Sequence, residues 1–224
     1  KPNGSTMNRT SKIFRSCASA AALAALCVPA LLPATPAYAA PSGDTAQLNQ
    51  AVEALRAIST MKADFVQTDR NGQSLTGELT LMRPGKIRFQ YQKSAQLLIV
   101  SDGKALTMID YSVKQVQRWP ISNTPLGPII DPRRDMAKYA TVKQTGNPNV
   151  VSIEVRDRSH PEYGVITLIF TRKASAPGGL ELSYWVALDS QNKRTTISLS
   201  NQRYGVPVSN NDFRWVDPRP KTRR

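Results

Sequence analysis

The sequence predicts a mainly β protein with helices, built around one large antiparallel sheet. From residue 63 onward, polar and apolar residues alternate with a period of two through most of the chain. Turn signals such as Asp102-Gly103 separate the alternating segments and favour hairpins. Only two stretches show helical features. A sheet of about eleven or twelve strands is expected to curl, because strongly twisted sheets of this size rarely stay open and flat.

The first helix is predicted to begin near residue 44. Leu48, Val52, Leu55 and Ile58 repeat at helical spacing and form one apolar face. Asp44 comes just before this repeat. We expect it to be the N-cap residue, because its carboxylate can accept a backbone N–H of the first turn.

The strands follow in order, with one interruption. They are predicted at residues 63–68, 75–82, 86–91, 96–101, 104–110, 113–119, 141–144, 150–156, 165–172, 181–188, 194–201 and 213–216. The interruption is an apolar loop that contains Pro125 and Pro128, which cannot donate to a central strand. It leads into a short helix predicted at 131–140, with Asp131 as its cap and Pro132 in its first position.

One arginine falls on an apolar face. Leu79, Leu81 and Arg83 share one side of their strand, because successive residues point to opposite faces. A strand-end arginine can extend to water along an apolar surface. Parity therefore locates Arg83 but leaves its role open.

The N-terminal part has the features of a secretory signal. Residues 1–6 precede Met7 and are expected to be extra N-terminal residues. A basic stretch with Arg9, Lys12 and Arg15 is followed by the apolar residues 20–32 and by Ala37-Tyr38-Ala39. We expect residues 7–39 to be a signal peptide cleaved after Ala39, and residues 40–224 to form a single domain. A short N-terminal anchor is the alternative.

Charge and cysteine usage indicate the compartment and the partners. Both cysteines, Cys17 and Cys27, precede residue 40, so the predicted domain has no disulfide. Export without disulfides indicates the periplasm of a Gram-negative bacterium. Four of the 30 basic residues also precede residue 40, which leaves 26 against 16 acidic ones and a net charge of +10. Such a surface favours phospholipid headgroups or acidic protein patches. An exported protein rarely meets nucleic acid, so none is expected as a partner.

The sequence does not predict an enzyme. His160 is the single histidine and precedes a proline in a predicted turn, which suits an exposed residue better than a general base. The acidic residues are spread singly, and metal sites need clustered ligands. Glycine-rich phosphate loops and nucleophile-elbow motifs are absent from the sequence. We expect no catalytic residue, no metal and no cofactor.

Several strands are apolar on one whole face. The rows are Leu79/Leu81, Ile87/Phe89/Tyr91, Leu97/Ile99 and Leu106/Met108. They can fill the core of a structural module. They can also line a cavity for an apolar ligand if the sheet forms a partly open barrel with helices across its mouth. The pattern alone leaves both interpretations open.

The order of five segments resembles the LolA family of periplasmic carriers of outer-membrane lipoproteins. The segments are ADFVQ (63–67), GELTLMRPGKIRFQY (77–91), LIVSDGKAL (98–106), NTPLGPII (123–130) and NQRYGVPVSNNDFRW (201–215). The resemblance implies an incomplete, strongly curved antiparallel β-barrel of about eleven strands, with a helical lid over an apolar cavity. It implies a chaperone that receives lipoproteins from an inner-membrane ABC transporter complex. Delivery would go to an outer-membrane receptor or an anionic membrane surface, and the carrier would be a monomer.

The resemblance also implies roles for individual residues. Arg83 matches a strand-end arginine before proline that holds the lid closed through hydrogen bonds in the unloaded state. Phe89 stands where the family usually has tryptophan. The implied lipid-binding cavity comprises Leu55, Phe65, Leu79, Leu81, Phe89, Tyr91, Leu98, Val100, Met108, Leu126, Ile129 and Ile130. A carrier of another amphiphile on the same fold, such as a glycolipid or lipid precursor, and a non-enzymatic protein-binding module are the alternatives.

Overall fold

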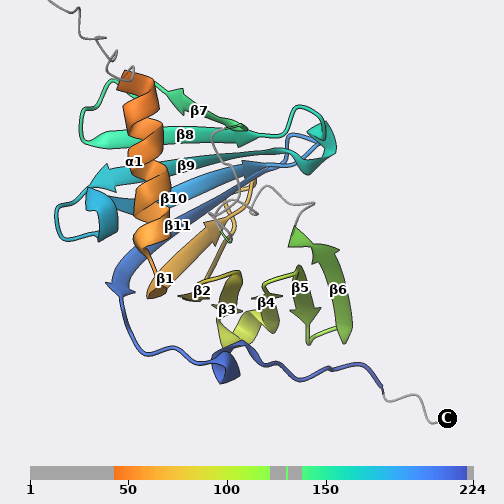
Figure 1. Cartoon of the computed structure of the whole chain (residues 1–224). Coiled ribbons are helices and arrows are strands. Elements are labelled where there is room, and N and C mark those ends of the chain that lie inside the picture. Colours follow the sequence, from red (N-terminus) through yellow and green to blue (C-terminus); the bar gives the residue numbers. More distant parts are fainter. Residues whose placement is uncertain (1–42, 122–129, 131–137, 221–224) are drawn as a thin grey trace, which may run out of the picture. The chain divides into compact units, whose positions relative to one another are not determined.

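The computed structural model describes residues 43–121, 130 and 138–220. Contacts divide the chain into two units, Lys1–Ala39 and Ala40–Arg224, and every described residue belongs to the second. Among its described residues, Gly43–Ala57 form the α-helix α1 (Figure 1). Its strands are β1 (Thr60–Thr68), β2 (Ser74–Met82), β3 (Lys86–Tyr91), β4 (Leu97–Asp102), β5 (Ala105–Asp110), β6 (Gln115–Pro120), β7 (Ala140–Lys143), β8 (Val150–Arg156), β9 (Val165–Arg172), β10 (Leu180–Leu188) and β11 (Arg194–Tyr204).

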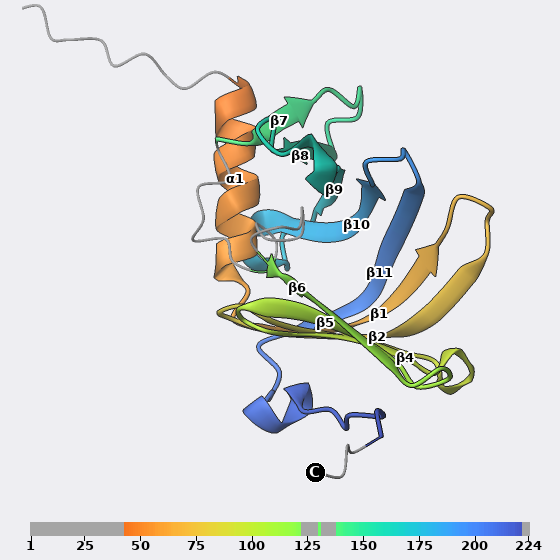
Figure 2. The ribbon, with the colours of Figure 1, turned by 90° about the vertical axis from the view of Figure 1, so that its right-hand side faces the viewer.

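These eleven strands form one antiparallel sheet that does not close. Their order in space is β6-β5-β4-β3-β2-β1-β11-β10-β9-β8-β7. All neighbours are consecutive in sequence except β1 and β11, which pair along their lengths. Strands β6 and β7 are the two edges, so the described sheet is an incomplete barrel. Figure 2 shows how strongly it curves.

Most strand predictions are confirmed. Three other predictions are wrong: a helix cap, one short strand and the end of a helix. α1 begins at Gly43, so Asp44 lies in its first turn instead of at the N-cap. The strand predicted at 213–216 does not form, because Ser209 and Asp212 make a capping box that starts a 3-10 helix at Asn210–Phe213. Ala140 begins β7 instead of ending the predicted second helix, whose residues 131–137 lie outside the described part.

Helix α1 lies across the side toward which the sheet curves (Figures 1 and 2). We call this side of the sheet the inner face. Ala51, Ala54, Leu55 and Ile58 are buried and belong to the same apolar cluster as residues from most of the strands. The sequence repeat at helical spacing thus predicts the side of α1 that packs.

The opposite side, the outer face, carries a second and smaller apolar cluster. Leu98, Val100, Ile109 and Phe213 form it. Phe213 belongs to the segment after β11, residues 205–220, which we call the C-terminal strap. Figure 2 shows the strap below β1, β2 and β4, on the outer side of the sheet. It covers apolar residues of β4 and β5 that would otherwise be exposed to water.

None of the described helices is both long enough and apolar enough to cross a membrane.

Candidate functional site

The inner face is the candidate site, because it gathers the largest apolar surface of the described residues. Strands β1, β2 and β3 contribute Phe65, Leu79, Leu81, Ile87, Phe89 and Tyr91, all buried. The far half of the sheet contributes Val151, Ile153, Val155, Ile166, Leu168, Phe170, Leu180, Leu182, Trp185, Ile197 and Leu199. Together with the α1 residues, Met61, Ala63, Leu106, Ile121 and Ile130, these form the inner cluster.

Aromatic rings connect the two halves of this cluster. The Phe65 ring meets those of Phe89 and Tyr91 edge-on, with centroids 5.4 Å and 5.0 Å apart. Phe89 in turn meets Trp185 of β10 at 6.0 Å. Such edge-to-face pairs add about 0.5–1.5 kcal/mol each beyond the burial of their area.

Tyr91 places a single polar group at the margin of this apolar surface. Its hydroxyl donates to Oε1 of Gln67 at 2.6 Å. Burial raises the pKa of the Tyr91 phenol well above its ordinary value, because the charged form would lose its hydration. Tyr91 is therefore neutral at physiological pH, and the inner face keeps its low polarity.

Arg83 lies immediately after β2 and joins two separate parts of the chain. Nη1 donates to the carbonyl of Ile130 at 2.6 Å, and Nη2 donates to the carbonyl of Leu55 at 3.2 Å. Leu55 is in the last turn of α1, where carbonyls have no partner within the helix. A cation is also favoured there by the helix dipole. Arg83 thus caps α1 and at the same time holds the backbone at Ile130.

Contacts with the β9–β10 hairpin also fix α1, at its middle and near its C-terminal end. Arg172 Nη1 donates to Oε1 of Gln50 at 2.8 Å, and Arg172 Nε donates to the carbonyl of Pro148 at 2.9 Å. Gly178 packs directly on α1, since a Cβ at this position would lie 2.7 Å from Cα of Ala54. Contacts at its middle and near its C-terminal end therefore position α1 on the sheet.

The comparison with known proteins agrees with this architecture. The model of a protein family described as "Outer membrane lipoprotein carrier protein LolA" matches residues 56–216. The chain belongs to the LolA family. The family assignment confirms the resemblance predicted from the sequence, and the open antiparallel sheet confirms the predicted fold class. By family, the chain is a lipoprotein carrier.

Individual relatives of the LolA family are distant. An outer-membrane lipoprotein carrier protein of Xanthomonas campestris is 26% identical over 180 residues, which cover 72% of this chain and 79% of the relative. One of Chromobacterium violaceum is 44% identical over 62 residues, or 26% of this chain and 30% of the relative. The crystal structure of a LolA superfamily protein from Nitrosomonas europaea has a TM-score of 0.45 at 11% identity, covering 77% of this chain and 97% of that one.

The structure places most of the predicted LolA-type cavity residues on one face. Those in the inner cluster are Leu55, Phe65, Leu79, Leu81, Phe89, Tyr91 and Ile130. Met108 pairs with Ile99, and Ile99 pairs with Phe89, so the register places Met108 on the inner face too. Leu126 and Ile129 lie outside the described residues.

The predicted placement of Leu98 and Val100 in the cavity is wrong. Both belong to the outer cluster with Phe213, so they cannot line a cavity on the inner face. Their neighbours Leu97 and Ile99 pack against the inner cluster instead. Strand parity separates these two pairs, since adjacent residues point to opposite faces.

Residues of β8, β9 and β10 were missed as candidates. Leu168, Phe170 and Trp185 belong to the inner cluster and are buried. The same period-two pattern that marks β2 and β3 marks these strands, but only the pairing of β1 with β11 joins the two halves into one surface.

Metal and acid-base groups do not gather in the part of the chain that the structure describes. No set of three His, Cys, Asp or Glu residues among the described ones could hold a metal ion. His160 Nδ1 lies 3.0 Å from Oε1 of Glu162, and its ring stacks on Tyr163 at 4.7 Å. These three residues are in the loop between β8 and β9, away from the inner face.

Proposed function

We propose that the protein carries lipoproteins across the periplasm by binding their acyl chains on the inner face of the sheet. The observation that carries the proposal is the continuous apolar surface of the inner cluster, from α1 through both halves of the sheet. The LolA family assignment supports it. The predicted cavity would lie over this surface.

The energetics favour such a carrier. An acyl chain loses about 0.8 kcal/mol per CH₂ group on entering water, so a chain of about sixteen carbons costs on the order of 12 kcal/mol. A lipoprotein therefore cannot cross an aqueous compartment unaided. Transfer from a bilayer to Leu, Ile and Phe side chains is close to balanced, and small conformational energies then decide loading and release.

Arg83 is proposed as the latch that supplies such an energy. The hydrogen bonds from Arg83 to the carbonyls of Ile130 and Leu55 come from a charged donor, and each contributes about 1.5–3 kcal/mol. They hold α1 and the chain at Ile130 together in the unloaded state. Acyl chains that enter between these parts would have to break the bond to Ile130. Because the bond forms again when the chains leave, it favours release.

The route of transport is also part of the proposal. Loading would take place at an inner-membrane ABC transporter complex and delivery at an outer-membrane receptor or an anionic membrane surface. Residues 7–39 would direct export and be removed after Ala39, and the domain 40–224 would act as a monomer without a cofactor.

Depletion of the protein in its host tests the proposal. Outer-membrane lipoproteins are expected to accumulate at the inner membrane, and normal sorting would contradict the assignment.

An assay with the purified protein tests whether acyl chains bind on the inner face. Extraction of a triacylated lipopeptide from vesicles should fail for Ile99→Asp, because Ile99 is on the inner face. Val66→Asp is the matched control, because Val66 is 39% exposed and follows Phe65 on the opposite side of β1. Equal loss in both variants would contradict the choice of the inner face.

A further inference from the structure

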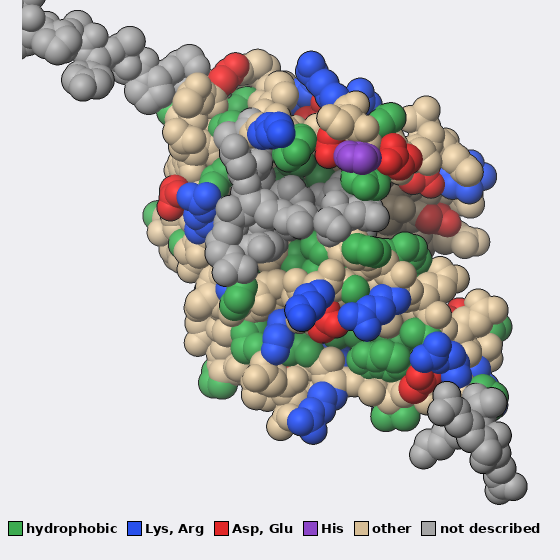
Figure 3. All heavy atoms as spheres, turned by 45° about the vertical axis from the view of Figure 1, so that its right-hand side comes forward, with side chains coloured by type: hydrophobic (Ala, Val, Ile, Leu, Met, Phe, Trp, Pro, Cys, Tyr) green, Lys and Arg blue, Asp and Glu red, His purple; other side chains and the backbone are tan. Residues whose placement is uncertain are grey.

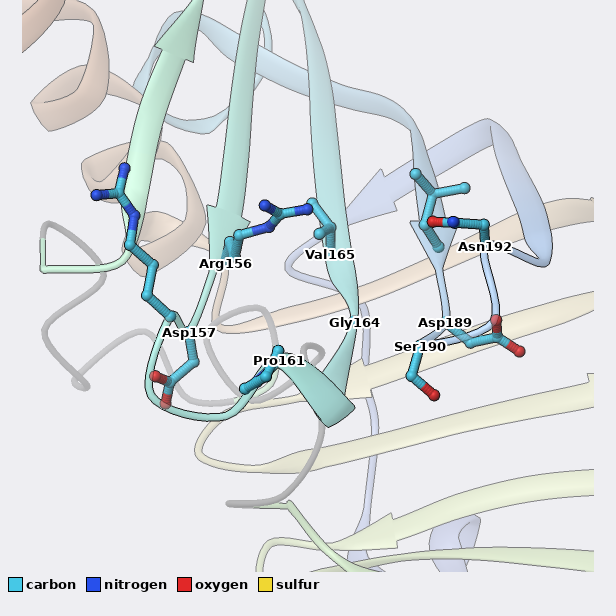
Figure 4. Close-up of a pocket in the computed structure, with 10 residues that line it drawn as sticks. Arg156, Asp157, Pro161, Gly164, Val165, Asp189, Ser190 and Asn192 are labelled. Carbon is cyan, nitrogen blue, oxygen red and sulfur yellow. The ribbon is translucent and has the colours of Figure 1, made fainter.

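A polar hollow lies on the outer face, away from the inner cluster. It has a volume of about 360 Å³ and lies between the β8–β9 loop and the β10–β11 turn (Figure 4). Its floor is apolar and its walls carry Arg156, Arg158, Ser190 and Asn192. We call it the loop-end pocket.

The strand register fixes the orientation of the pocket. Arg156 pairs with Val165, Val165 with Leu188, and Leu188 with Arg194, so these four residues form one row across β8 to β11. Directly paired residues share a face. The neighbouring residue Val155 belongs to the inner cluster, so this row is on the outer face. The row places an arginine at each end and two aliphatic side chains between them.

Gly164 keeps the two walls close together. A Cβ at Gly164 would lie 2.1 Å from the carbonyl oxygen of Leu188, and the φ angle of Gly164 is +77°. Any other residue would push the β8–β9 loop away from the β10–β11 turn. The pocket is therefore a consequence of the backbone and not of a chance arrangement of long side chains.

The cations of the pocket are available to a ligand. Within the described part of the chain, Arg156 and Arg158, which line the pocket, have no side-chain hydrogen bond or ion pair. A second hollow of about 330 Å³ shares Arg156 and Arg158 and adds Lys138. Figure 3 shows other Lys and Arg side chains on the face it presents, several of them close together beside an acidic side chain.

The two carboxylates of the pocket already have partners. Asp157 Oδ1 accepts the backbone N–H of Ser159 at 2.8 Å. Asp189 Oδ1 accepts those of Gln191 and Lys193 at 2.9 Å and 2.8 Å. In Figure 4 both carboxylates point away from the guanidinium of Arg156, which extends over Val165 toward Asn192. The interior of the pocket therefore presents donors.

We propose that the loop-end pocket binds the phosphate group of an anionic phospholipid headgroup. A planar guanidinium donates two parallel hydrogen bonds to a phosphate, and the Asn192 amide and Ser190 hydroxyl are further donors at the wall. Val165 and Leu188 give the floor an apolar surface for the glycerol part of the headgroup. The inference rests on the proposed function, since a carrier that serves membranes meets such headgroups. It assigns membrane contact to the ends of β8–β11.

Vesicle binding by the purified protein tests this. The probe is a vesicle of equal parts phosphatidylglycerol and phosphatidylcholine, with pure phosphatidylcholine as the reference. Arg156→Gln is expected to lower partitioning about tenfold, because it removes both a charge and a bidentate donor. Lys104→Gln, in the turn between β4 and β5 on the other half of the sheet, removes the same charge and should lower it by at most about fivefold.

Two further arms separate a specific pocket from general attraction. Arg156→Lys keeps the charge but loses the planar fork, so binding should stay at least about threefold below that of the unchanged protein. Full binding by Arg156→Lys, or equal losses in Arg156→Gln and Lys104→Gln, would overturn the pocket. Saturable binding of inorganic phosphate without any preference for phosphatidylglycerol vesicles would overturn the lipid as its source.

The carrier function is read out separately. Lipopeptide extraction from vesicles of pure phosphatidylcholine offers the pocket no anionic headgroup, so Arg156→Gln should extract as well as the unchanged protein. Failure of the protein without substitutions to extract the lipopeptide would refute the carrier proposal. Vesicle binding by Arg156→Gln equal to that of the protein without substitutions would refute only the pocket.

Discussion

Replacement of Arg83 by leucine should convert the carrier from one that releases its cargo to one that retains it. Arg83 donates to Leu55 and to Ile130. The Leu55 bond stays in both states, because Arg172 and Gly178 fix α1 to the sheet independently of Arg83. Of the two bonds that Arg83 makes to described residues, the one to Ile130 then differs between the closed and the loaded state.

The magnitude follows from that single bond. A hydrogen bond of 2.6 Å with a charged donor contributes about 2 kcal/mol, which corresponds to about a 30-fold change in an equilibrium constant. The loss stabilises the loaded state relative to the closed one. Arg83→Leu should therefore hold a lipopeptide about 30-fold more tightly and release it correspondingly more slowly to acceptor vesicles.

The assay is transfer of a fluorescent triacylated lipopeptide from the loaded protein to acceptor vesicles, with circular dichroism as the check on folding. Arg88→Leu is the matched control. Arg88 also donates to backbone carbonyls, those of Asp212 and Arg214, but it does so on the outer face. Arg88→Leu should lower stability by about 1 kcal/mol and leave release unchanged. Unchanged release by Arg83→Leu, or equal effects in both variants, would refute the latch.

Three further predictions concern stability. Gly178→Ala should lower the free energy of unfolding by about 1–3 kcal/mol more than Gly179→Ala, because both glycines have positive φ angles but only Gly178 meets Ala54 within 3 Å. Equal losses in urea unfolding would show that the contact with α1 is unimportant. Phe213→Ala should cost about 3 kcal/mol in urea unfolding and leave lipopeptide affinity unchanged, since Phe213 is on the outer face; a loss of affinity in the folded variant would contradict this. Backbone and side-chain hydrogen bonds from the Ser209 region lower the pKa of Asp212, so its stabilising contribution is present above about pH 3.9 and is lost as the pH falls through the lower folded-state pKa. Asp212→Asn should therefore reduce stability at neutral pH and approach the unchanged protein in acid, and a constant difference at all pH values would contradict the assignment.

Local pattern was enough to predict the strands and the buried side of α1. Strands β3, β8 and β9 begin and end where the alternation predicts them, because turn residues bound each one. Parity also identified Arg83 as the one cation in an apolar row. The partners of Arg83 depend on packing between distant segments, which no local pattern records.

The errors have physical causes. Leu98 and Val100 were assigned to the cavity by residue type, whereas their parity places them under the C-terminal strap. Residues 213–216 of the strap were predicted as a strand, but a side-chain capping box gave the backbone there a local alternative to sheet pairing. The loop-end pocket was not predicted at all, because the row from Arg156 to Arg194 exists only once β8 to β11 are paired.

The location of bound acyl chains tests the account most directly. A lipopeptide with a spin label on its acyl chain broadens the methyl resonances of nearby residues. Leu97 and Ile99 pack against the inner cluster, whereas Leu98 between them belongs to the outer cluster. We predict stronger broadening of Leu97 and Ile99 than of Leu98. Broadening of Leu98 that equals or exceeds that of its neighbours, or broadening of none of the three at saturating lipopeptide, would contradict binding on the inner face.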